Sequence, residues 1–160
     1  RAMNAIVVTD KQWAIGRSGD LLFSLPGDMK HFRTLTTGGT VIMGRKTLET
    51  LPGGRGLPDR RNLVLTRQES LTPDRAETVH SPEELLALAD SDAFVIGGQE
   101  VYTRLLPYCT RVYVTKVFVD VPADAFFPNL DKDPHWQVVS VGEPQEEAGL
   151  RFQYVEYRRV

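Results

Sequence analysis

Four short runs dominated by apolar residues constrain the fold of this chain more than any other feature. They occupy residues 5–8, 40–43, 63–66 and 93–96, and β-branched side chains are frequent in them. Apolar runs of this length are typical of strands that are buried on both faces of a sheet. Segments with helical periodicity separate the runs, and strands that alternate with helices predict an α/β domain with a largely parallel sheet.

Weaker strand patterns extend this sheet. Residues 78–80 predict a short strand, residues 111–119 a long one, and residues 136–141 and 150–157 an antiparallel pair at one edge. We therefore expect a single domain over residues 1–160, which is long enough to bury a full core. Its expected architecture is α/β, with a central eight-stranded, mostly parallel sheet, an antiparallel C-terminal edge and about four helices on the two faces.

The composition argues against several classes of function. The net charge of -2 provides no general field for nucleic acid, and no apolar run has the length of a membrane span or the form of a secretory signal. We therefore expect no nucleic-acid or membrane partner. The single cysteine, Cys109, cannot form an internal disulfide, which favours the cytoplasm. Arg1 and Ala2 precede Met3, and we expect the natural chain to begin at Met3. Three histidines without metal-ligand spacing are interpreted as structural or exposed, and we expect no metal site; they are His31, His80 and His135.

The most informative candidate residue, Asp28, lies in the first turn of a predicted helix. A proline occupies the first helical position, and apolar side chains at Leu25, Met29, Phe32 and Leu35 predict one buried face. A carboxylate at this position either complements the helix dipole or lies at the edge of an apolar pocket, facing a ligand that carries or receives a proton. The residue by itself leaves both interpretations open.

Three further features lie beside predicted strands. Residues 44–47, Gly-Arg-Lys-Thr, follow a strand directly and suit either a phosphate or a plain strand–helix turn. Gly97 and Gly98 separate a strand from a helix, as in dinucleotide sites. Arg60 precedes a strand and suits either a bound carboxylate or a solvated edge. We expect these features and Asp28 to meet at the carboxyl ends of the strands, where open α/β sheets bind ligands.

The segment between the first strand and the predicted helix has two parts. Residues 9–20 are rich in turn formers, and we expect a mobile surface loop there. Residues 21–23, Leu-Leu-Phe, are costly to leave solvated in a loop. They therefore predict either core or the wall of a ligand site.

Together these residues resemble the dihydrofolate reductase family along essentially the whole chain. The matching segments follow the family's order with near-family spacing; they are residues 14–16, 25–32, 41–47, 57–62, 95–98 and 112–115. The resemblance implies the NADPH-dependent reduction of 7,8-dihydrofolate to 5,6,7,8-tetrahydrofolate, by hydride transfer to C6 and protonation at N5.

The resemblance also implies a substrate site. Asp28 resembles the acid that hydrogen-bonds the pterin and promotes protonation at N5, and Thr115 resembles the threonine that bridges this carboxylate and the pterin. Arg60 is similar to the arginine that binds the substrate's α-carboxylate. Leu21, at the mobile-loop position near the nicotinamide, and Phe23 complete the implied catalytic set. The implied substrate-binding residues are Ile6, Val7, Asp28, Met29, Phe32, Leu51, Arg60, Ile96 and Thr115.

The cofactor implied by the resemblance is NADPH. Arg45, Lys46 and Thr47 resemble its phosphate site, with Thr66 and Arg67 near the adenosine 2′-phosphate. The implied cofactor-binding residues are Val8, Ile15, Gly16, Gly44, Arg45, Lys46, Thr47, Leu65, Thr66, Arg67, Ile96, Gly97, Gly98, Gln99, Glu100, Val101 and Tyr102.

The chain departs from the family's pattern at several positions, among them residues 53–56, which look like a small insertion beside Arg60. Leu22 and Phe23 stand where the family commonly has Pro-Trp, and phenylalanine lacks the indole N–H that holds a water. Glu100 stands where some relatives have a basic residue. Dihydrofolate and antifolate inhibitors are the small-molecule partners that the resemblance implies, and we expect a monomer.

Two alternatives stay open beside this hypothesis. One is a reductase of the same fold that acts on another pterin or on a ribosylaminopyrimidine, and the other is a folate- or nucleotide-binding module without catalysis. Arg60, placed for a glutamate tail, favours folate over the first alternative. The combination of Asp28 and Thr115 argues against the second, since a binding protein needs no proton route.

Overall fold

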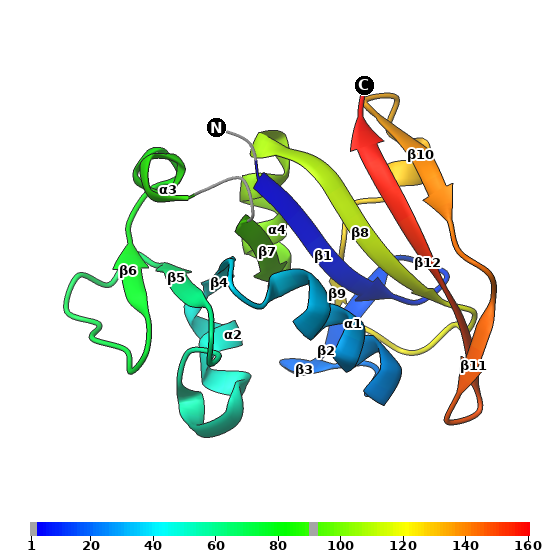
Figure 1. Cartoon of the computed structure of the whole chain (residues 1–160), viewed down its shortest axis with the longest axis horizontal. Coiled ribbons are helices and arrows are strands. Elements are labelled where there is room, and N and C mark those ends of the chain that lie inside the picture. Colours follow the sequence, from blue (N-terminus) through cyan, green and yellow to red (C-terminus); the bar gives the residue numbers. More distant parts are fainter. Residues whose placement is uncertain (1–2, 90–92) are drawn as a thin grey trace.

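The computed structural model describes residues 3–89 and 93–160 and has one main sheet (Figure 1). Arg1 and Ala2, which precede the expected start at Met3, lie outside the described residues. The strands follow one another across the sheet in the order β10 (Trp136–Val141), β12 (Leu150–Arg159), β8 (Cys109–Val117), β1 (Met3–Thr9), β7 (Ala93–Gly97), β4 (Thr40–Gly44), β5 (Arg61–Leu65) and β6 (Glu77–Val79), and β11 (Gln145–Glu147) pairs with β12.

The directions of these strands confirm the predicted architecture for the described residues. Neighbours from β8 to β6 are parallel. The pairs β8–β12, β12–β10 and β12–β11 are antiparallel. The eight strands in line are therefore mostly parallel with an antiparallel C-terminal edge, as the apolar runs and the alternating C-terminal segments predict.

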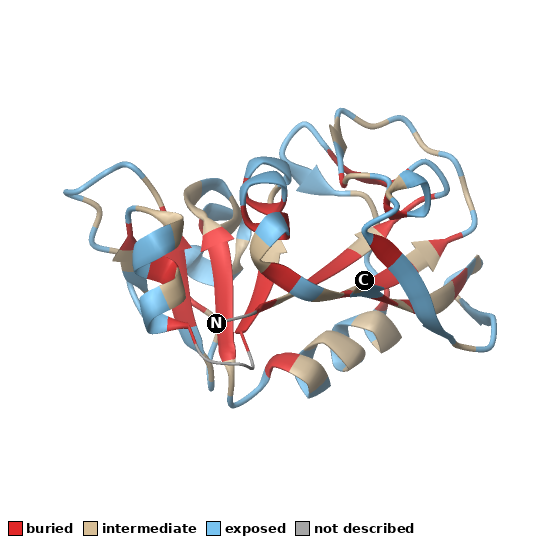
Figure 2. Cartoon of the chain, turned by 90° about the horizontal axis from the view of Figure 1, so that it is seen from above, coloured by how far each residue is buried: buried red, intermediate tan, exposed pale blue. Residues whose placement is uncertain are grey.

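The helices divide between the two faces of the sheet because alternate residues of each strand point to opposite faces. On β4, Ile42 joins the apolar cluster that contains Leu105, whereas Met43 joins the cluster that contains Leu48 and Phe32. Helices α1 and α4 accordingly lie on opposite faces (Figures 1 and 2). The α-helices of the described residues are α1 (Pro26–Thr36), α2 (Arg45–Thr50), α3 (Pro82–Leu88) and α4 (Gln99–Leu105), and the 3-10 helices are η1 (Pro52–Gly54), η2 (Leu106–Tyr108) and η3 (Leu130–Lys132).

The prediction of a mobile surface loop at residues 9–20 is wrong for its central part. Trp13 is 5% exposed and stacks on Phe127, with ring centroids 6.0 Å apart. The strand β2 (Ala14–Arg17) pairs with β3 (Asp20–Leu21) and with β9 (Ala125–Phe126) in a small second sheet. The buried carboxylate of Asp10 accepts hydrogen bonds from the backbone N–H groups of Gln12, Ala14 and Val121. These contacts fix the segment, although its sequence has the composition of a loop.

The prediction that the helix α1 buries one apolar face is confirmed only in part, since Leu25 is buried and Phe32 packs against a core cluster. Within α1 only Thr36 is buried, and Met29 is 52% exposed. Phe32 and Leu35 are partly buried, so the face is covered only in part (Figure 2). An apolar helix face that the protein leaves partly uncovered is a feature of ligand sites as well as of interfaces. Among the helices of residues 3–89 and 93–160, none has the length and apolar character needed to cross a bilayer.

Candidate functional site

The first turn of α1 places Asp28 against the central sheet. Pro26 holds the first helical position, and Leu25 precedes it without a side-chain cap. The hydroxyl of Thr115, on β8, donates a hydrogen bond of 2.6 Å to the Oδ1 atom of Asp28. Thr115 is 3% exposed, so it supplies this donor from within the sheet. The fold thus brings together the two residues that were paired in the sequence analysis, 87 positions apart in the chain.

Burial is the strongest influence on the pKa of Asp28. Desolvation raises the pKa of the Asp28 carboxyl above its ordinary value, and the negative charge of Glu147 raises this pKa further. The hydrogen bond from Thr115 and the proximity of His31 both act to lower it, but they do not outweigh burial. A carboxyl group with a raised pKa beside a partly uncovered apolar face is suited to proton chemistry.

His31 and Tyr154 lie on the same side of α1 as this carboxyl. Their rings stack with centroids 4.1 Å apart. Burial lowers the pKa of His31, and the negative charge of Asp28 only partly offsets this effect. The two rings also line a groove of about 200 Å³ between α1 and strands β8, β10 and β12. Asp28 is not part of that lining, so the groove lies beside the Asp28–Thr115 pair.

Two turns that were predicted to bind a cofactor lie next to each other at one edge of the sheet. Strands β4 and β7 are adjacent and parallel, and Met43 is paired with Gly97. Gly97 has a φ of +123°, and a Cβ atom at Gly98 would lie 3.7 Å from the Oγ1 atom of Thr47. Gly97 and Gly98 are joined by a cis peptide bond. The glycine turn and the Gly-Arg-Lys-Thr segment therefore approach each other closely.

The remaining predicted cofactor residues extend this edge or anchor it. Gly44 is paired with Leu65, so Thr66 and Arg67 follow β5 next to the Gly-Arg-Lys-Thr segment. Arg45 pairs with Glu49 on α2.

Tyr102 and Gln99 anchor the start of α4. The Tyr102 hydroxyl donates a hydrogen bond of 2.7 Å to the carbonyl oxygen of Ile6, and burial raises the pKa of this hydroxyl. The Oε1 atom of Gln99 accepts a hydrogen bond from the backbone N–H of Phe126. Both side chains thus have structural partners. Of the other predicted cofactor residues, Ile15, Gly16 and Val101 are buried, Val8, Gly44, Thr47 and Ile96 are partly buried, and Lys46 and Glu100 are exposed.

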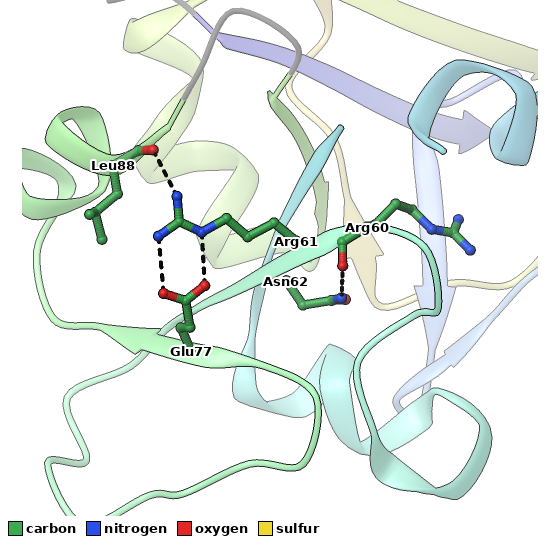
Figure 3. Close-up of polar contacts among 5 residues, drawn as sticks. All are labelled: Arg60, Arg61, Asn62, Glu77 and Leu88. Atoms are coloured by element: carbon green, nitrogen blue, oxygen red, sulfur yellow. Dashed lines mark hydrogen bonds and ion pairs between the residues drawn. The ribbon is translucent and has the colours of Figure 1, made fainter. Parts of the chain in front are cut away.

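The two neighbouring arginines before β5 have different roles. Arg61 donates to both carboxylate oxygens of Glu77, at 2.8 and 3.0 Å, and to the carbonyl oxygen of Leu88 (Figure 3). Arg60 points the opposite way, and its guanidinium carbon lies 5.9 Å from the ring centroid of Phe32. Arg60 therefore faces the C-terminal part of α1, while Arg61 belongs to the sheet edge.

The position of Arg60 corrects one expectation. It lies just before β5, at the amino end of that strand, whereas the sequence analysis placed all the site features at carboxyl ends. Its Nη1 atom donates to the Oγ1 atom of Thr36, and its Nε atom to the carbonyl oxygen of Pro58. The structure therefore brings Arg60 next to the far end of α1, and not next to the glycine turn.

The apolar residues predicted to bind substrate, and the predicted catalytic residues Phe23 and Leu21, are found in three environments. Phe32, Leu51 and Ile96 belong to one apolar cluster on the α1 face. Phe23 packs against a second cluster that contains Leu25. Ile6 and Val7 are buried in β1, whereas Met29 and Leu21 are exposed by 52% and 83%. Leu21 therefore does not belong to the core, and the core interpretation of residues 21–23 is wrong for this residue.

Sequence reasoning missed two residues of this region, Asp10 and Glu147. Asp10 organises the segment that leads to Ile15 and Gly16, and Glu147 approaches α1 from β11. Neither residue lies in a motif or in a periodic apolar pattern. Among the described residues, no group of three or more His, Cys, Asp or Glu side chains is arranged to hold a metal ion.

Comparison with known proteins gives one consistent match. A family model described as dihydrofolate reductase matches residues 2–159. A dihydrofolate reductase from Mycobacterium tuberculosis is 44% identical over 153 residues, which cover 91% of this chain and 90% of the relative. One from Bacillus subtilis is 34% identical over 158 residues, covering 96% and 92%. The solved structure of a dihydrofolate reductase from Enterococcus faecalis, complexed with NADP(H) and RAB-propyl, superposes with a TM-score of 0.87 at 35% identity, covering 99% of this chain and 96% of that one.

Proposed function

Because the chain belongs to the dihydrofolate reductase family, we propose that its reaction, the NADPH-dependent reduction of 7,8-dihydrofolate to 5,6,7,8-tetrahydrofolate, takes place beside the Asp28–Thr115 pair. The observation that carries this proposal is the hydrogen bond of 2.6 Å between Thr115 and a carboxyl group whose pKa is raised by burial. The bond holds one carboxylate oxygen in place. The other oxygen is then available to the pterin's 2-amino group and N3.

The role of Asp28 follows from the charge that develops on the substrate. Hydride addition to C6 of the C=N bond is easier when N5 carries a proton, because the electron pair then moves onto a cationic nitrogen. A carboxylate bound to the pterin favours the protonated ring by opposite charge, and a raised pKa keeps a proton on the acid–pterin pair at a higher pH. Asp28 thus orients the ring and helps to retain the proton that N5 receives.

The residues at the carboxyl ends of β7, β4 and β5 fit NADPH. The turn at Gly97 adopts a positive φ that favours glycine, and a Cβ atom at Gly97 or Gly98 would come within 3.7 Å of the Oγ1 atom of Thr47. Cationic side chains on the neighbouring strand ends suit the phosphates of a dinucleotide. When bound, NADPH supplies the hydride for C6. Arg45, Lys46 and Thr47 would hold its phosphates, with Thr66 and Arg67 at the 2′-phosphate.

Arg60 is proposed to bind the glutamate tail of the substrate. It lies against Phe32 at the far end of α1 from Asp28, and a guanidinium binds a carboxylate with two parallel hydrogen bonds. Phe32 and Leu51, in one cluster on this face, would contact the rings between the two polar ends. An arginine at this position favours folates over pterins without a tail.

Three further properties of the protein are proposed: its inhibitors, its oligomeric state and its location. We expect the protein to bind antifolates that resemble the pterin ring, to act as a monomer and to work in the cytoplasm. Sedimentation of the purified chain would test the monomer.

The test of the proposed site is the Asp28→Asn variant. Purified protein is mixed with dihydrofolate and either NADPH or NADH, and the loss of reduced-nicotinamide absorbance is followed. We expect Asp28→Asn to fold but to lose most of its turnover at neutral pH, because an amide cannot ionise. Asp74→Asn, the same change at an exposed acid that pairs with Arg55, is the control and should retain wild-type turnover. Near-normal turnover of Asp28→Asn would refute the role of Asp28.

A further inference from the structure

The first turn of α1 obtains its cap from a distant part of the chain. Leu25, at the N-cap position, provides no side-chain acceptor, and Pro26 has no N–H group. Gly27 is the next donor, and its backbone N–H lies 2.9 Å and 3.1 Å from the two carboxylate oxygens of Glu147. Glu147 therefore supplies the acceptor that an N-cap side chain would ordinarily supply.

A tight hairpin holds Glu147 in this position. Glu147 ends β11 and is paired with Leu150 of β12, so Ala148 and Gly149 form a two-residue connection. Both residues have positive φ, 53° and 76°, as tight hairpin turns require. The carboxylate thus comes from a rigid element that is paired to the main sheet.

Gly27 leaves the space that this contact needs. A Cβ atom at position 27 would lie 2.8 Å from the Oε2 atom of Glu147, closer than van der Waals contact permits. The atoms that would have to move belong to the end of a flexible side chain. Alanine at position 27 would therefore displace the carboxylate without changing the number of charges in the molecule.

Glu147 is one of several groups that surround Asp28. His31 lies on the same helix, Thr115 donates from β8, and Tyr154 stacks on His31 from β12. Burial is the main reason that the pKa of Asp28 is raised, and the negative charge of Glu147 acts in the same direction, against Thr115 and His31. Burial, followed by the negative charges of Asp28 and Glu147, likewise raises the pKa of Tyr154.

From this geometry we propose that Glu147 is a positioning residue for Asp28: seated on the first turn of α1, its carboxylate fixes the backbone next to Asp28 and places a second negative charge beside the acid. The proposal rests on the role of Asp28 proposed above. Glu147 acts by holding the turn and by repelling a second negative charge, and the pH profile is the readout that separates these two effects.

The test compares pH profiles of kcat for three variants. Glu147→Gln keeps an acceptor for the Gly27 N–H but removes the charge, Glu147→Ala removes both, and Gly27→Ala displaces the charged group. We expect the descending limb to move down by about 0.5–1 pH unit in Glu147→Gln, because a like charge next to Asp28 is lost. At pH values well above this descending limb, kcat of Glu147→Gln should be about three- to tenfold lower than that of the wild type. At low pH, where kcat no longer depends on pH, the change should be less than about twofold. Gly27→Ala should move the limb in the same direction.

Glu146→Gln is the matched control, because Glu146 is the exposed neighbour on the same strand and is paired with Arg151. Its profile should match the wild type. The proposal is overturned if the descending limb of the pH profile of Glu147→Gln stays where it is in the wild type. It is also overturned if kcat falls equally at every pH, which is the result that a purely structural role predicts. Asp28→Asn, measured in the same series, separates the two proposals: near-normal turnover there would remove the role of Asp28, whatever Glu147 does.

Discussion

Replacing Asp10 by alanine should cost more stability than most single changes in this protein. Asp10 is 2% exposed, and its two carboxylate oxygens accept hydrogen bonds from three backbone N–H groups. The donors belong to Gln12 at 2.8 Å, Ala14 at 2.9 Å and Val121 at 3.1 Å. Alanine leaves all three without this acceptor, in a segment that is anchored between β1 and the small second sheet.

The expected loss follows from how well water can replace each bond. Ala14 is 1% exposed, so its N–H is stranded, at a cost of about 2–3 kcal/mol. The other two bonds are only partly buried, and each should contribute about 0.5–1.5 kcal/mol. The free energy of unfolding should fall by about 3–6 kcal/mol in total, which for a domain of this size lowers Tm by roughly 10–20 °C.

Urea unfolding of wild type and variant, followed by far-UV circular dichroism, measures this difference. Asp120→Ala is the control, because Asp120 lies in a nearby loop and pairs with Lys11 at 3.7 Å with both side chains more than half exposed. The control should lose less than about 1 kcal/mol. If Asp10→Ala also loses less than about 1 kcal/mol, water replaces the carboxylate and the reasoning fails. A raised KM for NADPH should accompany the loss, since residues 14–16 would shift.

Two further predictions concern Arg60 and Asp28. Arg60→Ala should raise KM for dihydrofolate about 10- to 100-fold with kcat nearly unchanged, because it removes binding made equally in the ground and transition states. Arg55→Ala, at an exposed arginine, is the control, and a fall in kcat at constant KM would contradict the assignment. The pKa of Asp28 is raised in the folded protein, so stability falls as pH rises from the carboxyl's ordinary value of 3.8 through the raised value. Asp28→Asn should therefore be more stable than wild type at neutral pH, with the gain vanishing at about pH 4 or below; equal stability at neutral pH would refute this.

The central strands could be predicted because their signal is local. Residues 5–8, 40–43 and 93–96 are apolar on both faces, and they form β1, β4 and β7. The strands β2 and β9 could not be predicted in this way. They contain four and two residues, and they are held by the buried carboxylate of Asp10 and by the stacking of Trp13 on Phe127. Such contacts join residues that are far apart in the chain, so the local pattern of apolar and polar residues does not predict them.

The same limit applied to the site. Arg60 and Arg61 are adjacent residues of the same type, so the sequence alone does not distinguish their roles. Their partners in the fold do: Glu77 binds Arg61, whereas Arg60 lies against Phe32. Similarly, the net effect of burial and of the helix N-terminus on Asp28 could not be decided from its position. The fold decides it, because desolvation outweighs the hydrogen bond from Thr115.

Two features of α1, the helix that carries Asp28, lower the stability of the free protein. Its apolar side chains at Met29 and Phe32 are left partly uncovered, which forgoes part of the hydrophobic stabilisation that their burial would give. Its carboxyl group is desolvated, which opposes ionisation at neutral pH. A ligand with an apolar ring and a cationic, hydrogen-bonding edge would relieve both at once. The ring would cover the face, and the edge would pair the carboxylate. Ligand binding should therefore stabilise this part of the fold, and the uncovered face and the desolvated carboxyl both favour a ligand of this kind.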